Sequence, residues 1–236
     1  MADCSYLIME ETLVKLIADI RIYNFSDSEK HIELDFRSSS RAVHRVAMKL
    51  RELKFSLGEF DHLYINFTTC AAKGSVALID TVDQYHPWYR YCDVGVSMDE
   101  YERLESPEFI FEQIENVLLS LFCPDMQTEE IIRESIAEAK KGPEMQVACK
   151  QKKSAKYTAT ICLRLLDNGY YLPLLQVVDT NGNEVLCRDL PEVFDLGFLG
   201  EIQLNSKRIT IKPRKNAFTK DLTPITVELP HSSDMK

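Results

Sequence analysis

The chain has 236 residues, and 37 acidic against 28 basic side chains give it a formal net charge of −9 at pH 7. Apolar residues make up 45% of the sequence, enough for a packed core, which excludes an intrinsically disordered chain. Its eight glycines are about half the usual share of ~7%. Because neither G-x-G-x-x-G nor the P-loop pattern occurs, we expect no nucleotide-binding loop. The acidic balance also argues against direct nucleic-acid binding.

Several features favour a cytoplasmic location. The first residues lack the basic and apolar stretches of a secretion signal, and apolar runs elsewhere are far shorter than the ~20 residues of a membrane span. The seven cysteines are scattered, without any C-x-x-C pair, so we expect reduced thiols. No histidines have the spacing of a helical zinc site, and we therefore expect neither a metal nor another cofactor.

Helix and strand patterns alternate through the first 143 residues. Apolar residues at helical spacing predict helices, and strict alternation predicts half-buried strands. Ser106-Pro107 has the signature of a helix start, and Gly142-Pro143 that of a helix end. The predicted elements in chain order are a helix at 9–22, a strand at 31–36, a helix from the serines at 38–40 to 54, strands at 63–67, 76–79 and 89–96, and helices from 107 to Pro124 and from 128 to about 141.

After Pro143 the apolar period changes from 3.6 to 2. Asn168-Gly169 and Asn181-Gly182 are strong hairpin signals. Pro173 cannot donate to a strand ladder, which predicts an edge position or a bulge there. The predicted strands lie at 157–166, 170–178, 184–188, 202–204, 209–212 and 225–229. We therefore predict an α+β protein in which an N-terminal mixed α/β layer domain, residues 1–143, precedes a mostly antiparallel β module, residues 144–236.

Charge divides at the same boundary. Residues 1–143 carry a net charge of −11 and residues 144–236 a net charge of +2, and residues 80–138 contain 15 acids against three bases. Clustered charge of one sign accelerates association with an oppositely charged partner, although charged helix faces are often plain solvated surface. The candidate steering residues are Glu100, Glu102, Glu105, Glu108 and Glu112. The helix around Arg41 is instead basic, which suits a phosphate or an acidic partner, or solubility alone.

Residues 80–93 form the segment richest in chemically active side chains. They include three carboxylates, the only tryptophan, three tyrosines, a histidine and a cysteine. Aromatic and arginine side chains are enriched at interface hot spots, so this segment is a candidate binding surface, with an aromatic corner of the core as the alternative. A catalytic use would pair an aspartate with the histidine as a base. The candidate interface residues are Trp88, Tyr89, Tyr91 and Asp93.

The strand LYINFTT at 63–69, the segment WYRYCDVGV at 88–96 and the two glutamate-rich helices that follow together resemble bacterial immunity proteins of polymorphic-toxin systems. The resemblance covers residues 60–140. It implies a small, cytosolic, acidic α/β or α+β protein that binds and blocks a cognate toxin. It identifies no particular toxin, and residues 144–236 lie outside it.

Together these observations predict a non-enzymatic cytosolic binding protein, in its concrete form an immunity-type inhibitor that neutralises a basic toxin such as a nuclease. The aromatic residues would anchor the interface while the glutamates steer the partner. We expect no membrane partner. Two alternatives stay open. One is a hydrolase-like enzyme that uses Asp83, His86, Cys92 and Asp93, and the other is an adaptor or structural subunit that docks through its β module.

Overall fold

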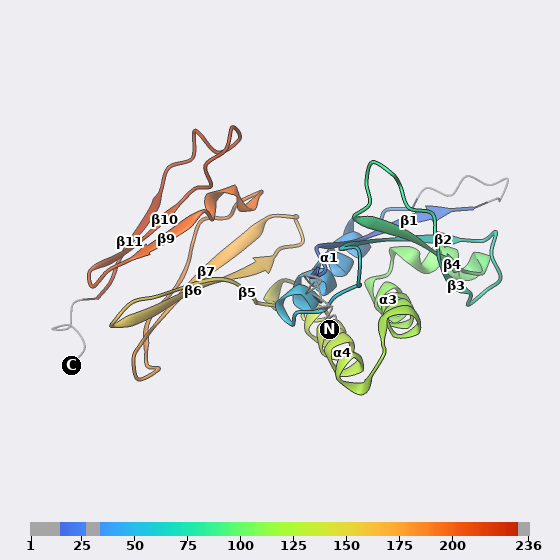
Figure 1. The fold of residues 1–236 in the computed structure, drawn as a ribbon, viewed down its shortest axis with the longest axis horizontal. Helices are drawn as coiled ribbons and strands as arrows, with labels where there is room; N and C mark the ends of the chain where they lie inside the picture. The colour runs from blue at the N-terminus through green and yellow to red at the C-terminus, as the bar shows by residue number, and fades with distance from the viewer. Residues whose placement is uncertain (1–14, 27–33, 231–236) are drawn as a thin grey trace, which may run out of the picture.

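The computed structural model describes residues 15–26 and 34–230, which form an α/β part and a β module at opposite ends of the molecule (Figure 1). The predicted α+β fold class is confirmed. The elements are β1 (Asp19–Phe25), α1 (Arg37–Glu52), β2 (His62–Thr68), β3 (Val76–Leu78), β4 (Tyr89–Gly95), α2 (Met98–Glu102), α3 (Pro107–Phe122), α4 (Met126–Ala139), β5 (Val147–Lys153), β6 (Tyr157–Leu165), β7 (Tyr171–Asp179), β8 (Glu184–Asp189), β9 (Glu201–Leu204), β10 (Arg208–Lys212) and β11 (Ile225–Glu228).

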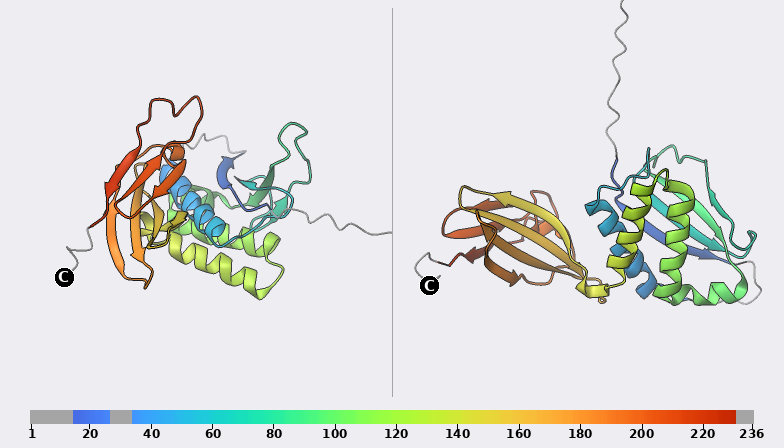
Figure 2. Two further views of the ribbon diagram at one scale, coloured as in Figure 1. Left: turned by 60° about the vertical axis from the view of Figure 1, so that its left-hand side comes forward. Right: turned by 90° about the horizontal axis from the view of Figure 1, so that it is seen from below.

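The α/β part is a four-stranded sheet with helices on one face. Its strand order is β1-β2-β4-β3, with β1, β2 and β4 parallel and β3 antiparallel to β4. Leu63, Ile65 and Phe67 alternate along β2 and are fully buried, so they make one face of the sheet apolar. The helices α1 and α3 lie over that face and α4 packs against both (Figures 1 and 2). No helix in the part of the chain that the structure describes is long and apolar enough to cross a membrane.

Helix ends follow the capping chemistry of the sequence. Ser106 accepts a hydrogen bond from the backbone N–H of Phe109 and precedes a proline at the first position of α3. The aspartate Asp125 caps α4 by accepting from the N–H of Thr128 at 2.8 Å, so this helix begins two residues before its predicted start. Gly142, with φ of +62°, lies just after α4, where the chain turns toward β5.

The β module consists of two antiparallel sheets packed face to face. The strand orders are β5-β6-β7-β8 and β11-β10-β9, so both sheets are meanders. Buried side chains of the two sheets, among them Ile161, Leu175 and Ile209, form a second apolar cluster that is separate from the α/β core. Gly169 and Gly182 have φ of +87° and +85°, which confirms the two Asn-Gly hairpins.

Two predicted elements near the N-terminus are wrong in the residues that the structure describes. Residues 19–22 belong to β1 and not to a helix, because Ile20 and Ile22 are buried while Arg21 and Tyr23 alternate with them on the other face. Residues 34–36, the end of the predicted strand at 31–36, precede α1 without forming a strand. Residues 9–14 and 31–33 of these predictions lie outside the described residues. The strand β5 was not predicted, because most of its side chains are exposed.

Pro173 does not lie in an edge strand, so that part of the prediction is wrong. The bulge alternative is confirmed, because the pairing opposite Pro173 shifts by one residue between the Leu174–Asp189 pair and the Tyr171–Val193 bridge. Its strand, β7, is paired on both sides, to β6 and to β8. The carbonyl of Pro173 accepts from the N–H of Leu190 at 2.8 Å, one residue after β8 ends. In an antiparallel strand the N–H and C=O of one residue face the same neighbour. The missing N–H of Pro173 therefore faces the point where the β8 ladder has ended, and no sheet edge is left bare there.

Candidate functional site

The sheet face opposite the helices is lined by tyrosines. Tyr23 of β1, Tyr64 of β2, and Tyr89 and Tyr91 of β4 project from it, and we call these four residues the tyrosine face. The ring of Tyr64 lies in their midst, with its centroid 5.8 Å from Tyr23, 5.6 Å from Tyr91 and 4.7 Å from Tyr89. Tyr23 and Tyr91 are 40% and 41% exposed.

Exposure of this face is unusual for a sheet that is mainly parallel. Parallel strands are usually covered on both faces, because their crossover helices pack on each side. Here no helix or strand within residues 15–26 and 34–230 covers the tyrosine face. Tyrosine combines a large apolar ring with a hydroxyl group and is enriched at protein interfaces for that reason. The tyrosine face is therefore the leading candidate for a binding surface.

Two carboxylates adjoin the tyrosine face. Asp93 of β4 accepts a hydrogen bond from the side-chain amide of Asn66 at 3.1 Å, and Asp83 accepts from the hydroxyl group of Tyr89 at 3.0 Å. The guanidinium group of Arg21 lies 5.3 Å from the centroid of the Tyr64 ring, and its charge is matched by a nearby carboxylate of β1. The face thus combines aromatic rings with negative charge.

Asp83 organises the loop that joins β3 to β4. One carboxylate oxygen accepts from the backbone N–H groups of Tyr85, at 2.8 Å, and His86, at 3.0 Å. The His86 ring in turn lies edge-on to Trp88, with centroids 4.8 Å apart. This loop rises from the sheet on the side away from α3 and α4 (Figure 1), so it borders the tyrosine face.

The order of this loop should depend on pH. The hydrogen bond from the Tyr85 N–H, with smaller contributions from Tyr89 and His86, lowers the pKa of Asp83 below its usual 3.8. The folded loop is therefore stabilised above that value, and this stabilisation is lost as the pH falls through the lowered pKa. Fluorescence of Trp88, the only tryptophan, should change over this acidic range. In an Asp83→Asn variant, which keeps the acceptor oxygen but cannot titrate, the change should be absent; an unaltered transition there would contradict the role of Asp83.

The structure brings the predicted aromatic residues together but separates them from the glutamates. Tyr89, Tyr91 and Asp93 share one face, and Trp88, 39% exposed, directly precedes them. Glu108 and Glu112 are exposed on α3, which covers the opposite face of the sheet. The remaining glutamates have local roles or face solvent: Glu100 caps α2 and pairs with Lys73, Glu105 accepts from the Asp35 N–H, and Glu102 is exposed.

The residues of the catalytic alternative are only partly close to one another. The Nδ1 atom of His86 lies 3.3 Å from the carboxylate oxygen Oδ1 of Asp83. The Cys92 side chain points to the helix side and is fully buried, and burial raises the pKa of its thiol to about 11, so the thiolate form is scarce at neutral pH. Within the described residues, no cluster of three or more His, Cys, Asp or Glu side chains is arranged to hold a metal ion.

Tyr23 and Tyr64 complete the face but were not identified from the sequence. The alternation of Leu63, Ile65 and Phe67 already placed Tyr64 on the opposite side of its strand. For Tyr23 the signal was hidden, since its strand was interpreted as the end of a helix. The pairing of β1 with β2 and of β2 with β4 sets these rings beside those of β4.

Comparison of the chain with protein-family models, curated protein sequences and solved structures finds no match. Function is therefore inferred from the side chains that the fold brings together, and above all from the tyrosine face.

Proposed function

We propose that this chain is a binding protein that recognises a basic protein partner through the tyrosine face. In its concrete form it is a bacterial, cytoplasmic immunity-type inhibitor that blocks a basic toxin. The observation that carries the proposal is the set of four contacting tyrosines on a sheet face that none of the described helices covers. Trp88 at the border adds a second aromatic type that is common at binding hot spots.

The chemistry of the face favours lysine and arginine side chains in the partner. Cations bind over aromatic rings, as Arg21 already does over Tyr64 within the chain. Asp83 and Asp93 offer carboxylates beside the rings, and charge-assisted hydrogen bonds to arginine are stronger than neutral ones. A cationic side chain of the partner could therefore contact a ring and a carboxylate at the same time.

Long-range attraction supports the same class of partner. The α/β part carries most of the negative charge of the chain, which accelerates encounter with a basic protein. Glu108 and Glu112 lie on the other side of the sheet, so they act through this field without touching the partner. Screening over about 8 Å at physiological ionic strength confines their effect mainly to low salt.

Substitutions on the tyrosine face test the proposal directly. Tagged wild type, a Tyr23→Thr/Tyr91→Thr double variant and a Tyr170→Thr control are used to capture partners from a lysate of the organism that encodes the chain. Threonine keeps strand propensity while removing the ring, and Tyr170 is a tyrosine of similar exposure, 40%, in the β module. The captured protein is identified by mass spectrometry, purified and titrated against all three.

We expect a partner with a high isoelectric point that binds wild type and the control equally. The double variant should bind at least about 30-fold more weakly, since a single hot-spot residue contributes about 2 kcal/mol or more. Binding of the double variant within threefold of wild type would overturn the role of the face. An acidic partner would overturn the proposed chemistry of recognition.

A further inference from the structure

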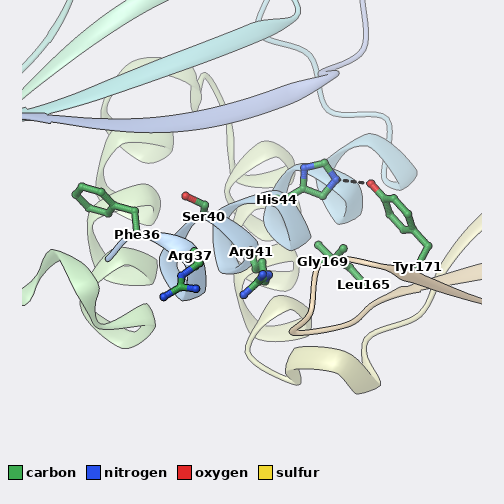
Figure 3. A pocket seen from close by; sticks show the side chains of 8 residues that line it. All are labelled: Phe36, Arg37, Ser40, Arg41, His44, Leu165, Gly169 and Tyr171. Carbon is green, nitrogen blue, oxygen red and sulfur yellow. Dashed lines mark hydrogen bonds between the residues drawn. The ribbon is translucent and has the colours of Figure 1, made fainter. Parts of the chain in front are cut away.

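A cavity of about 460 Å³, widely open to solvent, lies between α1 and the hairpin of β6 and β7 (Figure 3). Both parts of the molecule contribute to it. Its lining residues are Phe36, Arg37, Ser40, Arg41 and His44 from the α1 side, and Leu165, Gly169 and Tyr171 from the hairpin. Cavities of 300–1,000 Å³ are typical of sites for small molecules. The size and the two-sided lining make this cavity a candidate ligand site.

The lining combines an apolar surface with positive charge. Phe36, Leu165 and the ring of Tyr171 supply most of the apolar part, while two guanidinium groups and the Ser40 hydroxyl supply hydrogen-bond donors. Of the described residues that line the cavity, none is acidic. A ligand that fits must therefore have an apolar body and must bring its own negative charge.

Arg41 differs from most of the other basic side chains of α1. Three of those side chains each pair with a carboxylate at 2.6 Å: Arg37 with Asp35, Arg45 with Asp167, and Lys49 with Glu52. Among the described residues none lies within ion-pair distance of Arg41, and the Asp35 carboxylate, which pairs with Arg37, interacts with it only at longer range. Its guanidinium group lies beside Gly169, where even a β-carbon would make only ordinary van der Waals contact with it at 3.6 Å. The charge of Arg41 is thus available to a ligand.

His44 and Tyr171 form a fixed wall of the cavity. The His44 Nε2 atom lies 2.9 Å from the Tyr171 hydroxyl oxygen (Figure 3), and its Nδ1 atom lies 3.6 Å from the Asp19 carboxylate. Burial raises the pKa of Asp19, but hydrogen bonds with His44 and Arg21 outweigh it and hold the pKa below its usual value. The Asp19 carboxylate and the Tyr171 hydroxyl group thus hold the His44 ring at both of its nitrogens. Burial also raises the pKa of Tyr171, so the hydroxyl keeps its proton.

We propose that this cavity binds a small organic anion with an aromatic or branched apolar body and a single carboxylate or phosphate group. Arg41 pairs with the anionic group. Leu165 and Tyr171, which lie side by side at one end of the lining, contact the body (Figure 3). Because the lining comes from both parts of the molecule, an occupant also holds α1 against the β6–β7 hairpin. The lining contains none of the four tyrosine-face residues, although Ser40 and His44 also line a neighbouring pocket with Tyr23.

The test uses the full chain and four small probes. Phenyl phosphate and benzoate carry both a ring and an anionic group, inorganic phosphate lacks the ring, and benzyl alcohol lacks the charge. Binding is measured by isothermal titration calorimetry and by amide chemical shifts in NMR spectra. We expect at least one aromatic anion to bind at least tenfold more tightly than inorganic phosphate or benzyl alcohol. Whether phenyl phosphate or benzoate binds more tightly distinguishes a phosphate ligand from a carboxylate ligand.

Variants then locate the site. Arg41→Gln should weaken binding of the aromatic anion at least tenfold, while Arg208→Gln, a change at an exposed arginine of β10, should leave it unchanged. Equal binding of inorganic phosphate and phenyl phosphate would show attraction to surface charge only and would overturn the proposal. The absence of binding by both aromatic anions, or unaltered binding to Arg41→Gln, would overturn it as well.

Discussion

Replacing Phe67 with alanine should lower the free energy of unfolding by about 3–5 kcal/mol, the range for deleting a buried aromatic ring. Phe67 is fully buried on β2, on the face that the helices cover. Strands on both sides hold β2 in place, so the structure cannot collapse readily into the cavity that the substitution leaves. Urea unfolding followed by Trp88 fluorescence measures the loss, because the only tryptophan lies in the same part of the molecule.

A substitution on the opposite face of the same sheet is the matched control. Tyr91→Thr removes a ring that is 41% exposed and keeps the strand propensity of the site. It should cost about 1 kcal/mol or less. A loss as large as that of Phe67→Ala would show that the tyrosine face is packed like a core, which would remove the basis for treating it as a binding surface.

The second large effect is expected where α1 meets the β module. Arg45 is 5% exposed, and its guanidinium group donates to the backbone carbonyl of Leu165 at 2.8 and 3.1 Å and to the Asp167 carboxylate at 2.6 Å. Arg45→Met keeps much of the side-chain volume but removes these donors, leaving the Leu165 carbonyl without them. Hydrogen bonds that involve a charged group contribute about 1.5–3 kcal/mol each. We expect the free energy of unfolding to fall by about 2–3 kcal/mol.

Urea unfolding followed by far-ultraviolet circular dichroism measures this change, since it reports both parts of the molecule. The matched control is Arg37→Met on the same helix, because the ion pair of Arg37 with Asp35 is exposed and should leave the unfolding midpoint nearly unchanged. If Arg45→Met unfolded like this control, the hydrogen bonds of Arg45 to Leu165 and Asp167 would contribute nothing to stability.

Elements with strong local signals were predicted correctly. Ser106-Pro107 set the start of α3 through capping and a fixed φ. The Asn-Gly turns at 168–169 and 181–182 set two hairpins, because glycine adopts the positive φ that these tight turns require. In each case the physical cause lies within a few residues, so it is visible in the sequence.

Elements that depend on distant partners were predicted less well. The residues of β1 share helical spacing with those before them, and only parallel pairing with β2 shows them to be a strand. For Pro173 the sequence predicted an edge position or a bulge; the strand is an inner one, and a one-residue shift of the pairing opposite Pro173 accommodates the missing N–H. Neither the partner strand nor its length can be obtained from the residues of one strand.

The candidate site likewise combines residues that the sequence predicted with residues that only the strand pairing brings beside them. The strand predicted at 89–96 was confirmed as β4, and the period of two along it sets Tyr89, Tyr91 and Asp93 on one face. Their neighbours Tyr23 and Tyr64 come from strands that pair across long sequence separations. The separation of these rings from Glu108 and Glu112 follows from α3 crossing behind the sheet, which the one-dimensional charge pattern does not contain.

The sequence by itself determined the composition of this protein's surfaces: an acidic α/β part, a nearly neutral β module, an aromatic segment at 80–93 and a basic helix around Arg41. These are sums and periodicities, which do not depend on how the chain packs. Only the tertiary structure decided which face of the sheet the helices leave uncovered (Figure 1). It also decided that Arg41 lies at a cavity whose lining contains no carboxylate. Both are set by strand order and by the contact between α1 and a hairpin more than a hundred residues away, and such contacts depend on the free energy of the whole fold.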